Sequence, residues 1–216
     1  MRPGRLHNFA FCILHFALSS VLYIISGKAK GRKLHFPDTD KCRPSTEKVR
    51  EAIEATLKPF LTADTQVLDL FAGSGALGME LISLGAASCV FVDLVTYSIE
   101  GNITRLNWEA SCKIWRGDAL RYLSTHRSAR FDIICLDPPY AKDNLLDTTL
   151  NTIAEFKTLQ PYGVIVIEHA MQHKVTAPAA MKVCRVKVYG SSQVSYVVHE
   201  AYDPFQKTLF QVAEFT

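Results

Sequence analysis

The stretch VLDLFAGSGALG, Val67–Gly78, decides the fold of this chain. Its first half is an apolar run broken by one acid, Asp69, which is typical of a buried β-strand. Gly73 and Gly75 then allow a tight turn, and the residues after Gly75 predict a helix. A strand, a glycine-rich turn and a helix form the first half of a βαβ unit. We therefore expect a parallel sheet with helices on both faces.

The same alternation continues on both sides of this stretch. An amphipathic helix is expected from Thr46 onward, because Val49, Ile53 and Leu57 recur at a spacing of four. KVCRVKVYG and VSYVVHE near the end read as two strands joined by a short turn, which predicts an antiparallel hairpin. The fold class is thus a Rossmann-like α/β fold with a mostly parallel seven-stranded sheet. The core strands are expected at 66–71, 88–93, 112–117, 131–137 and 163–169, and the helices between them at 75–86, 97–110, 118–124 and 143–159.

Charge is distributed unevenly along the 216 residues. Residues 1–50 hold ten Lys or Arg and three Asp or Glu, a net charge of +7, whereas residues 51–216 hold fourteen and eighteen, a net charge of −4. A basic segment on a mildly acidic body indicates a polyanionic partner. The alternative is a solvated basic arm without a partner. The six cysteines form no C-x-x-C pair, so we expect reduced thiols and no metal site.

The N-terminal segment has an apolar run at residues 9–25 that resembles a signal peptide or a short membrane span. We favour instead a strand over Val21–Gly27 that pairs with Gly31–Phe36 as a basic hairpin. The expected layout is an extra arm at 1–20, the hairpin and a loop at 21–44, the main domain at 45–202 and a tail at 203–216. We hypothesise that translation starts near Val21 without residues 1–20, which the intact mass of the native protein would decide.

Four successive predicted strands end in, or lead directly into, an acid: Asp69, Asp93, Asp118 and Asp137. Ligands of such sheets bind at the carboxyl ends of the strands. Asp69 suits a ligand with a cationic amino group, Asp93 could accept ribose hydroxyls, and Asp118 an adenine amine. The alternative for each is a helix N-cap, which strand-to-helix turns favour. Four acids in this pattern beside a glycine-rich turn predict a cofactor with an adenosyl group.

The fourth strand ends in LDPPY, where Asp137, Pro138, Pro139 and Tyr140 follow one another. The prolines fix the backbone, and an exposed ring beside a carboxylate is suited to clamping a flat base that carries an amine. The alternative is a stiffened loop with a tyrosine at the edge of the core.

These motifs resemble those of a known family. LDLFAGSGALGMEL with DPPY looks like a class I S-adenosylmethionine-dependent methyltransferase that modifies amines. Together with GRKL, RPSTEKVREAI and the closing GSSQVSYV, they resemble the bacterial 16S ribosomal RNA (guanine-N2)-methyltransferases from about residue 22 to 198. One departure is Leu94 and Val95, which stand where the family commonly has a charged pair.

The resemblance implies a role for individual residues. Thr46, Asp69, Phe71, Ala72, Gly73 and Gly75 would hold the methionine part of S-adenosylmethionine, Asp93 its ribose, and Asp118 with Ala119 its adenine. Asp137, Pro138, Pro139 and Tyr140 would hold the target base. The residues expected to face RNA are Arg32, Lys33, Arg43 and Arg50.

The function expected from the sequence is methyl transfer to the N2 amine of a guanine in 16S ribosomal RNA. DPPY also occurs in adenine-N6 and other amino methyltransferases, so methylation of adenine N6 or of another nucleic-acid amine is an alternative. A non-catalytic RNA-binding assembly factor is a third alternative. We expect a cytoplasmic monomer that acts on 16S ribosomal RNA or the small ribosomal subunit, without a metal and away from membranes.

Overall fold

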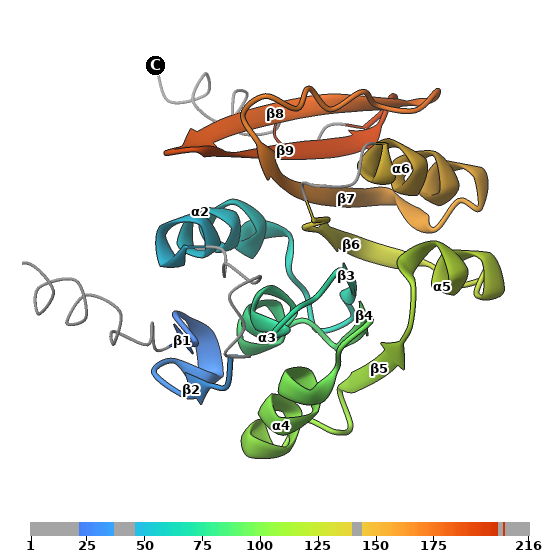
Figure 1. The fold of residues 1–216 in the computed structure, drawn as a ribbon. Helices are drawn as coiled ribbons and strands as arrows, with labels where there is room; N and C mark the ends of the chain where they lie inside the picture. Colours follow the sequence, from blue (N-terminus) through green and yellow to red (C-terminus); the bar gives the residue numbers. More distant parts are fainter. Residues whose placement is uncertain (1–21, 37–45, 140–143, 203–204, 206–216) are drawn as a thin grey trace, which may run out of the picture.

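The apolar runs pair into one seven-stranded sheet in the computed structural model, which describes residues 22–36, 46–139, 144–202 and 205 (Figure 1). The strand order is β5-β4-β3-β6-β7-β9-β8, with parallel pairing from β5 to β7 and antiparallel pairing beyond. This confirms the predicted fold class. The strands of this sheet are β3 (Gln66–Leu70), β4 (Ser88–Asp93), β5 (Cys112–Arg116), β6 (Phe131–Leu136), β7 (Leu159–Ala170), β8 (Met181–Tyr189) and β9 (Ser192–His199).

Alternate residues of the central strands face two separate cores. Val67 and Cys135 pack on one face, whereas Leu68 and Leu136 pack on the other, as the period of two in a strand requires. The first face is covered by α2 (Glu47–Leu57), α3 (Ala76–Ser83) and α4 (Tyr97–Leu106), and the second by α5 (Ala119–Thr125) and α6 (Leu145–Glu155) (Figure 1). Both faces of the sheet are therefore apolar, which explains the nearly continuous apolar runs of its sequence.

The chain reverses its direction of travel across the sheet at β3. It first places β4 and β5 on one side of β3 and then returns to place β6 on the other side, where Asp69 pairs with Cys135. The carboxyl ends of β3 and β6 therefore flank the switch point in strand order, the position at which sheets of this kind bind ligands.

The N-terminal hairpin forms as predicted, in a separate two-stranded sheet. β1 (Leu22–Tyr23) pairs antiparallel with β2 (Lys33–Leu34), and the short 3-10 helix η1 (Gly27–Ala29) lies in the turn. Glu80 of α3 accepts hydrogen bonds from the backbone N–H of Ile25 at 2.9 and 3.1 Å. Since a buried carboxylate needs such donors, this contact fixes the hairpin against α3.

Some boundaries differ from those predicted. β7 begins at Leu159, four residues earlier than expected, because Leu159 already pairs with Phe131 across an irregularity in β6. A second 3-10 helix, η2 (Lys58–Phe60), follows α2 without a break. The predicted arm at 1–20 and all of the predicted tail except Phe205 lie outside the described residues.

Candidate active site

The turn between β3 and α3 has an unusual backbone. Phe71, Gly73 and Gly75 have φ angles of 61°, 56° and 76°. Phe71 is not a glycine, so its left-handed conformation costs on the order of 1 kcal/mol or more, and such strain clusters at functional sites. A Cβ atom at Gly73 would meet no atom within 4 Å, so this side of the turn leaves room for a ligand against the backbone.

Asp69 lies buried beneath this turn, with 5% of its surface exposed. Its Oδ2 accepts a hydrogen bond of 3.0 Å from the N–H of Gly78. Only a glycine fits there, because a Cβ at Gly78 would lie 2.5 Å from the Phe91 ring and 2.9 Å from Asp69 Oδ2. Burial raises the pKa of Asp69 to about 7, with a further contribution from the Asp93 carboxylate, against the lowering effect of the Gly78 hydrogen bond.

Asp93 ties the end of β4 to the same turn. Its Oδ2 accepts a hydrogen bond of 2.8 Å from Gly73 N–H, and its Oδ1 accepts one of 2.9 Å from Val95 N–H. Asp93 is partly exposed. The acids of two neighbouring strands, Asp69 and Asp93, are thus bound to backbone amides of one glycine-rich segment.

Two other predicted cofactor residues begin helices. Asp118 Oδ1 accepts a hydrogen bond of 3.0 Å from Arg121 N–H and caps α5, which continues through the buried Ala119. Thr46 Oγ1 accepts one of 3.4 Å from Val49 N–H and caps α2. Both polar side chains are exposed. Asp118 is therefore a helix N-cap, as the alternative interpretation of the sequence had it. Its contact with adenine stays a prediction.

The segment Asp137–Pro139 leaves β6 at the switch point, beside the end of β3. Asp137 is partly buried, Pro138 is buried and Pro139 is exposed. Burial raises the pKa of Asp137 well above its ordinary value, and the carboxylates of Glu168 and Asp69 raise it further. Like charges in one desolvated place are costly, and such clusters are typical of functional sites. Tyr140 lies outside the described residues.

Glu168 is a member of this cluster that the sequence analysis missed. It is 8% exposed on β7, directly after Ile167, which pairs with Leu136 next to Asp137. The signal was present in GVIVIEH, since the fifth core strand also carries an acid near its end. The neighbouring His169 is 3% exposed and shares a hydrogen bond of 2.8 Å with Ser195 Oγ, so it joins β7 to β9.

The residues expected to face RNA separate into three cases. Arg32 and Lys33 are exposed on the hairpin, and Arg43 lies outside the described residues. The prediction for Arg50 is wrong. It is 2% exposed, and its Nη1 lies 3.4 Å from Oε1 of the buried Glu80. α2 turns position 50 toward α3, so this guanidinium lies beside an internal acid and is out of reach of RNA.

The residues at this edge fit S-adenosylmethionine. The open side of Gly73 admits a ligand against the backbone, and the buried carboxylate of Asp69 is suited to a cationic amino group. Asp93 holds the turn from the adjacent strand end, where a ribose binds in sheets of this kind. The acids that lie beside the turn, and not a lysine within it, distinguish this arrangement from a phosphate-binding loop.

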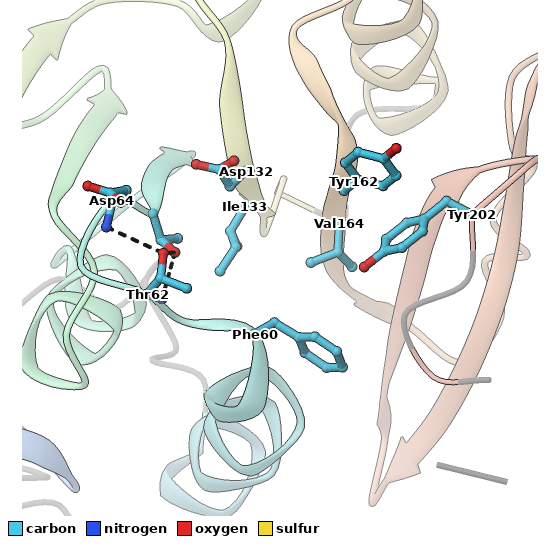
Figure 2. A pocket seen from close by; sticks show the side chains of 9 residues that line it. Phe60, Thr62, Asp64, Asp132, Ile133, Tyr162, Val164 and Tyr202 are labelled. Carbon is cyan, nitrogen blue, oxygen red and sulfur yellow. Dashed lines mark hydrogen bonds between the residues drawn. The ribbon is translucent and has the colours of Figure 1, made fainter. Parts of the chain in front are cut away.

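A pocket of about 290 Å³ lies at the opposite, amino edge of the sheet (Figure 2). Asp64 and Asp132 lie on one side of it and the rings of Tyr162 and Tyr202 on the other (Figure 2). Asp132 Oδ2 accepts a hydrogen bond of 2.8 Å from Gln66 N–H at the start of β3. This pocket has neither the glycine turn nor the strand carboxyl ends, so we do not place the reaction there.

The part of the chain that the structure describes contains no group of three or more His, Cys, Asp or Glu arranged to hold a metal ion. Within those same residues, no helix has the length and apolarity to cross a membrane.

Solved structures share this fold. A hypothetical protein of Thermus thermophilus is 25% identical, with a TM-score of 0.71 over 83% of this chain and 99% of that one. SMU.776, complexed with SAH, shares the fold at 16% identity and a TM-score of 0.54 over 69% of this chain and 48% of that one. Fold and site, together with the ribosomal RNA methyltransferase relative described next, define an enzyme of the S-adenosylmethionine-dependent methyltransferase class.

The family described as Conserved hypothetical protein 95 matches residues 22–198. Ribosomal RNA small subunit methyltransferase D of Escherichia coli K12 is 32% identical over 186 residues, which cover 84% of this chain and 91% of the relative. The chain belongs to the Conserved hypothetical protein 95 family, and its resemblance to the bacterial 16S ribosomal RNA methyltransferases is confirmed.

Proposed function

We propose that this chain transfers a methyl group from S-adenosylmethionine to the N2 amine of a guanine in 16S ribosomal RNA. The observation that carries the proposal is the position of Asp137 and Pro138 at the carboxyl end of β6, beside the glycine turn that follows β3. The name of the Escherichia coli relative supports ribosomal RNA as the substrate, and the exposed basic hairpin with Arg32 and Lys33 supplies charge for an RNA backbone.

The chemistry that the chain has to supply concerns the nucleophile. When bound, S-adenosylmethionine supplies a methyl group on a cationic sulfur, a leaving group that needs no acid. The lone pair of an exocyclic base amine is delocalised into the ring. If Asp137 and the carbonyl of Pro138 accept the two amine hydrogens, the nitrogen can become pyramidal, and this stabilisation is greatest in the transition state.

The surroundings of Asp137 fit this role. Pro138 is buried and the two prolines restrict the backbone, so both acceptors are held before the base arrives. The raised pKa of Asp137 makes its carboxylate a stronger acceptor for amine hydrogens once it is ionised. Tyr140 is proposed to stack on the base, which is worth about 1–3 kcal/mol in such contacts. The target base has to lie in a loop or flip out of a helix.

The experiment is methylation of ribosomal RNA from a strain that lacks this protein, with labelled S-adenosylmethionine and nucleoside analysis. We expect N2-methylguanosine at one site in 16S RNA. N6-methyladenosine would support the alternative that DPPY leaves open, and no methylated nucleoside on either naked RNA or small subunits would contradict the proposal. The retained Asp137 and glycine turn argue against a non-catalytic assembly factor. We also propose that the protein acts as a monomer in the cytoplasm.

A further inference from the structure

The N-terminal hairpin lies along α4 and is attached at several points of that helix. At the far end, Nη2 of Arg32 donates a hydrogen bond of 2.6 Å to the carbonyl of Arg105 in the last turn of α4. Nζ of Lys28 lies 5.3 Å from the centroid of the Trp108 ring, just beyond the helix. His35, at the other end of the hairpin, lies beside Tyr97 in the first turn of α4. The hairpin therefore runs from the C-terminus of α4 toward the carboxyl edge of the sheet.

Asn102 of α4 fixes the end of this hairpin relative to the glycine turn. It is fully buried, its Oδ1 accepts a hydrogen bond of 2.5 Å from His35 N–H, and its Nδ2 donates to the His35 carbonyl at 2.8 Å. Nδ2 also donates at 3.1 Å to the carbonyl of Ser74, which lies within the turn. One side chain thus joins the hairpin to the cofactor turn, so groups near His35 have a defined position beside the catalytic edge.

An exposed apolar patch lies at this junction. Tyr97 is 74% exposed, and its ring centroid lies 6.0 Å from that of His35 at an interplanar angle of 82°. Leu94 and Val95, between Asp93 and α4, are 61% and 60% exposed. Single exposed apolar residues are ordinary, but three within four positions beside a candidate active site indicate a contact surface.

We propose that Tyr97, held beside His35, is a stacking platform for an unpaired nucleobase of the substrate RNA. The inference rests on the proposed function. Charge favours RNA as the occupant of this patch over an apolar peptide, since the hairpin that leads to the patch, and the C-terminal end of α4 at its far end, carry an excess of cations. The exposed cations are Lys28, Lys30, Arg32, Lys33 and Arg105, against the exposed acids Glu100 and Glu109. Cations that follow a backbone, together with an aromatic ring for a base, are the usual means of binding single-stranded nucleic acid.

The test is the substitution Tyr97→Ala, measured in two assays. One gives the Kd for a fluorescein-labelled single-stranded RNA oligonucleotide, and the other gives steady-state kinetics on ribosomal RNA from a strain lacking the protein. We expect Kd and the KM for RNA to rise about tenfold, with kcat and the affinity for S-adenosylmethionine unchanged, because one stacking contact is lost. Tyr97→Phe keeps the ring and should restore wild-type values.

Two controls sharpen the result. Tyr162→Ala removes a tyrosine that is 79% exposed at the amino edge of the sheet, and it should leave both constants unchanged. Lys33→Ala should lower the slope of log K against log salt by about 1, whereas Tyr97→Ala should leave that slope as it is, since the ring contacts no phosphate.

The outcomes separate the platform from the proposed function. If the Tyr97→Ala variant binds the oligonucleotide as tightly as the Tyr162→Ala variant does, the proposal that Tyr97 stacks on a base is contradicted. If the wild-type protein binds RNA through Tyr97 but methylates no ribosomal RNA, the proposed function fails and the platform stands.

Discussion

The carboxyl edge of the sheet and its amino edge both hold acids near exposed aromatic rings, yet their acids have different surroundings. At the carboxyl edge, Asp69 and Asp93 accept hydrogen bonds from amides of the glycine-rich segment, and burial raises the pKa of Asp69 and Asp137. At the amino edge, Asp64 is exposed and Asp132 accepts a hydrogen bond from the start of β3.

The difference teaches that a well-formed pocket is not by itself the better candidate for catalysis. The pocket of about 290 Å³ at the amino edge has aromatic walls and two acids, but the strained turn between β3 and α3 does not lie beside it. The carboxyl edge combines the left-handed Phe71 with desolvated carboxylates on adjacent strands, and strain and desolvation persist where a site needs them.

The largest effect is expected for Asp137→Ala at the carboxyl edge. Loss of the acceptor for an amine hydrogen should lower kcat by about 10²–10³-fold or more, by analogy with the removal of one group that stabilises a transition state. The Kd for S-adenosylmethionine, measured by calorimetry, should stay near the wild-type value. Near-normal turnover would contradict the role given to Asp137.

A smaller effect is expected from pH. The pKa of Asp69 is raised to about 7, so its carboxyl takes up a proton as the pH falls through 7. If the ionised form receives the cationic amino group, affinity for S-adenosylmethionine should fall as the pH drops through 7 and at pH 6 be about tenfold lower than with Asp69 fully ionised. Calorimetry across this range checks it, with Asp69→Asn as the variant that flattens the profile. A wild-type affinity that does not change with pH would exclude this role for Asp69.

The smallest effect is expected for the double substitution Asp64→Asn with Asp132→Asn at the amino edge. Both side chains keep their shape, and an asparagine oxygen can still accept from Gln66 N–H, so kcat/KM should change by less than about twofold. A large loss of activity at an unchanged melting temperature would bring the amino-edge pocket into the reaction and remove the contrast between the two edges.

Much of this fold could be predicted from sequence because its signals are local. Apolar period, glycine turns and strand-end acids fixed the strand positions to within a few residues and placed Asp69, Asp93 and Asp137 at one edge. A residue's neighbours across the sheet are not local. Glu168 was missed because its importance comes from the pairing of β6 with β7.

Arg50 shows the complementary failure. Arg50 lies in a basic N-terminal region, which predicted that it faces RNA. Inside the protein it instead donates a hydrogen bond to Glu80, 30 positions later in the chain. The helix period places Arg50 on the same side of α2 as the buried Ile53 and Leu57, three and seven positions later. The stripe that predicted the helix therefore also contained the sign that this arginine points inward. Charge summed over a segment does not reveal which of its members are already paired.

The order of the strands has a consequence for how the enzyme is made. β3 and β6 are neighbours, and Gln66 N–H and the Asp132 carboxylate that bond across them are 66 residues apart in the chain. Contacts between distant segments form late, because a long loop must close first. β4 and β5 lie within that loop, so Asp137 reaches the glycine turn only after these two strands have been synthesised. A nascent chain that ends before β6 lacks the segment proposed to bind the amine, so the proposed methyl transfer requires β3 to β6 to be in place.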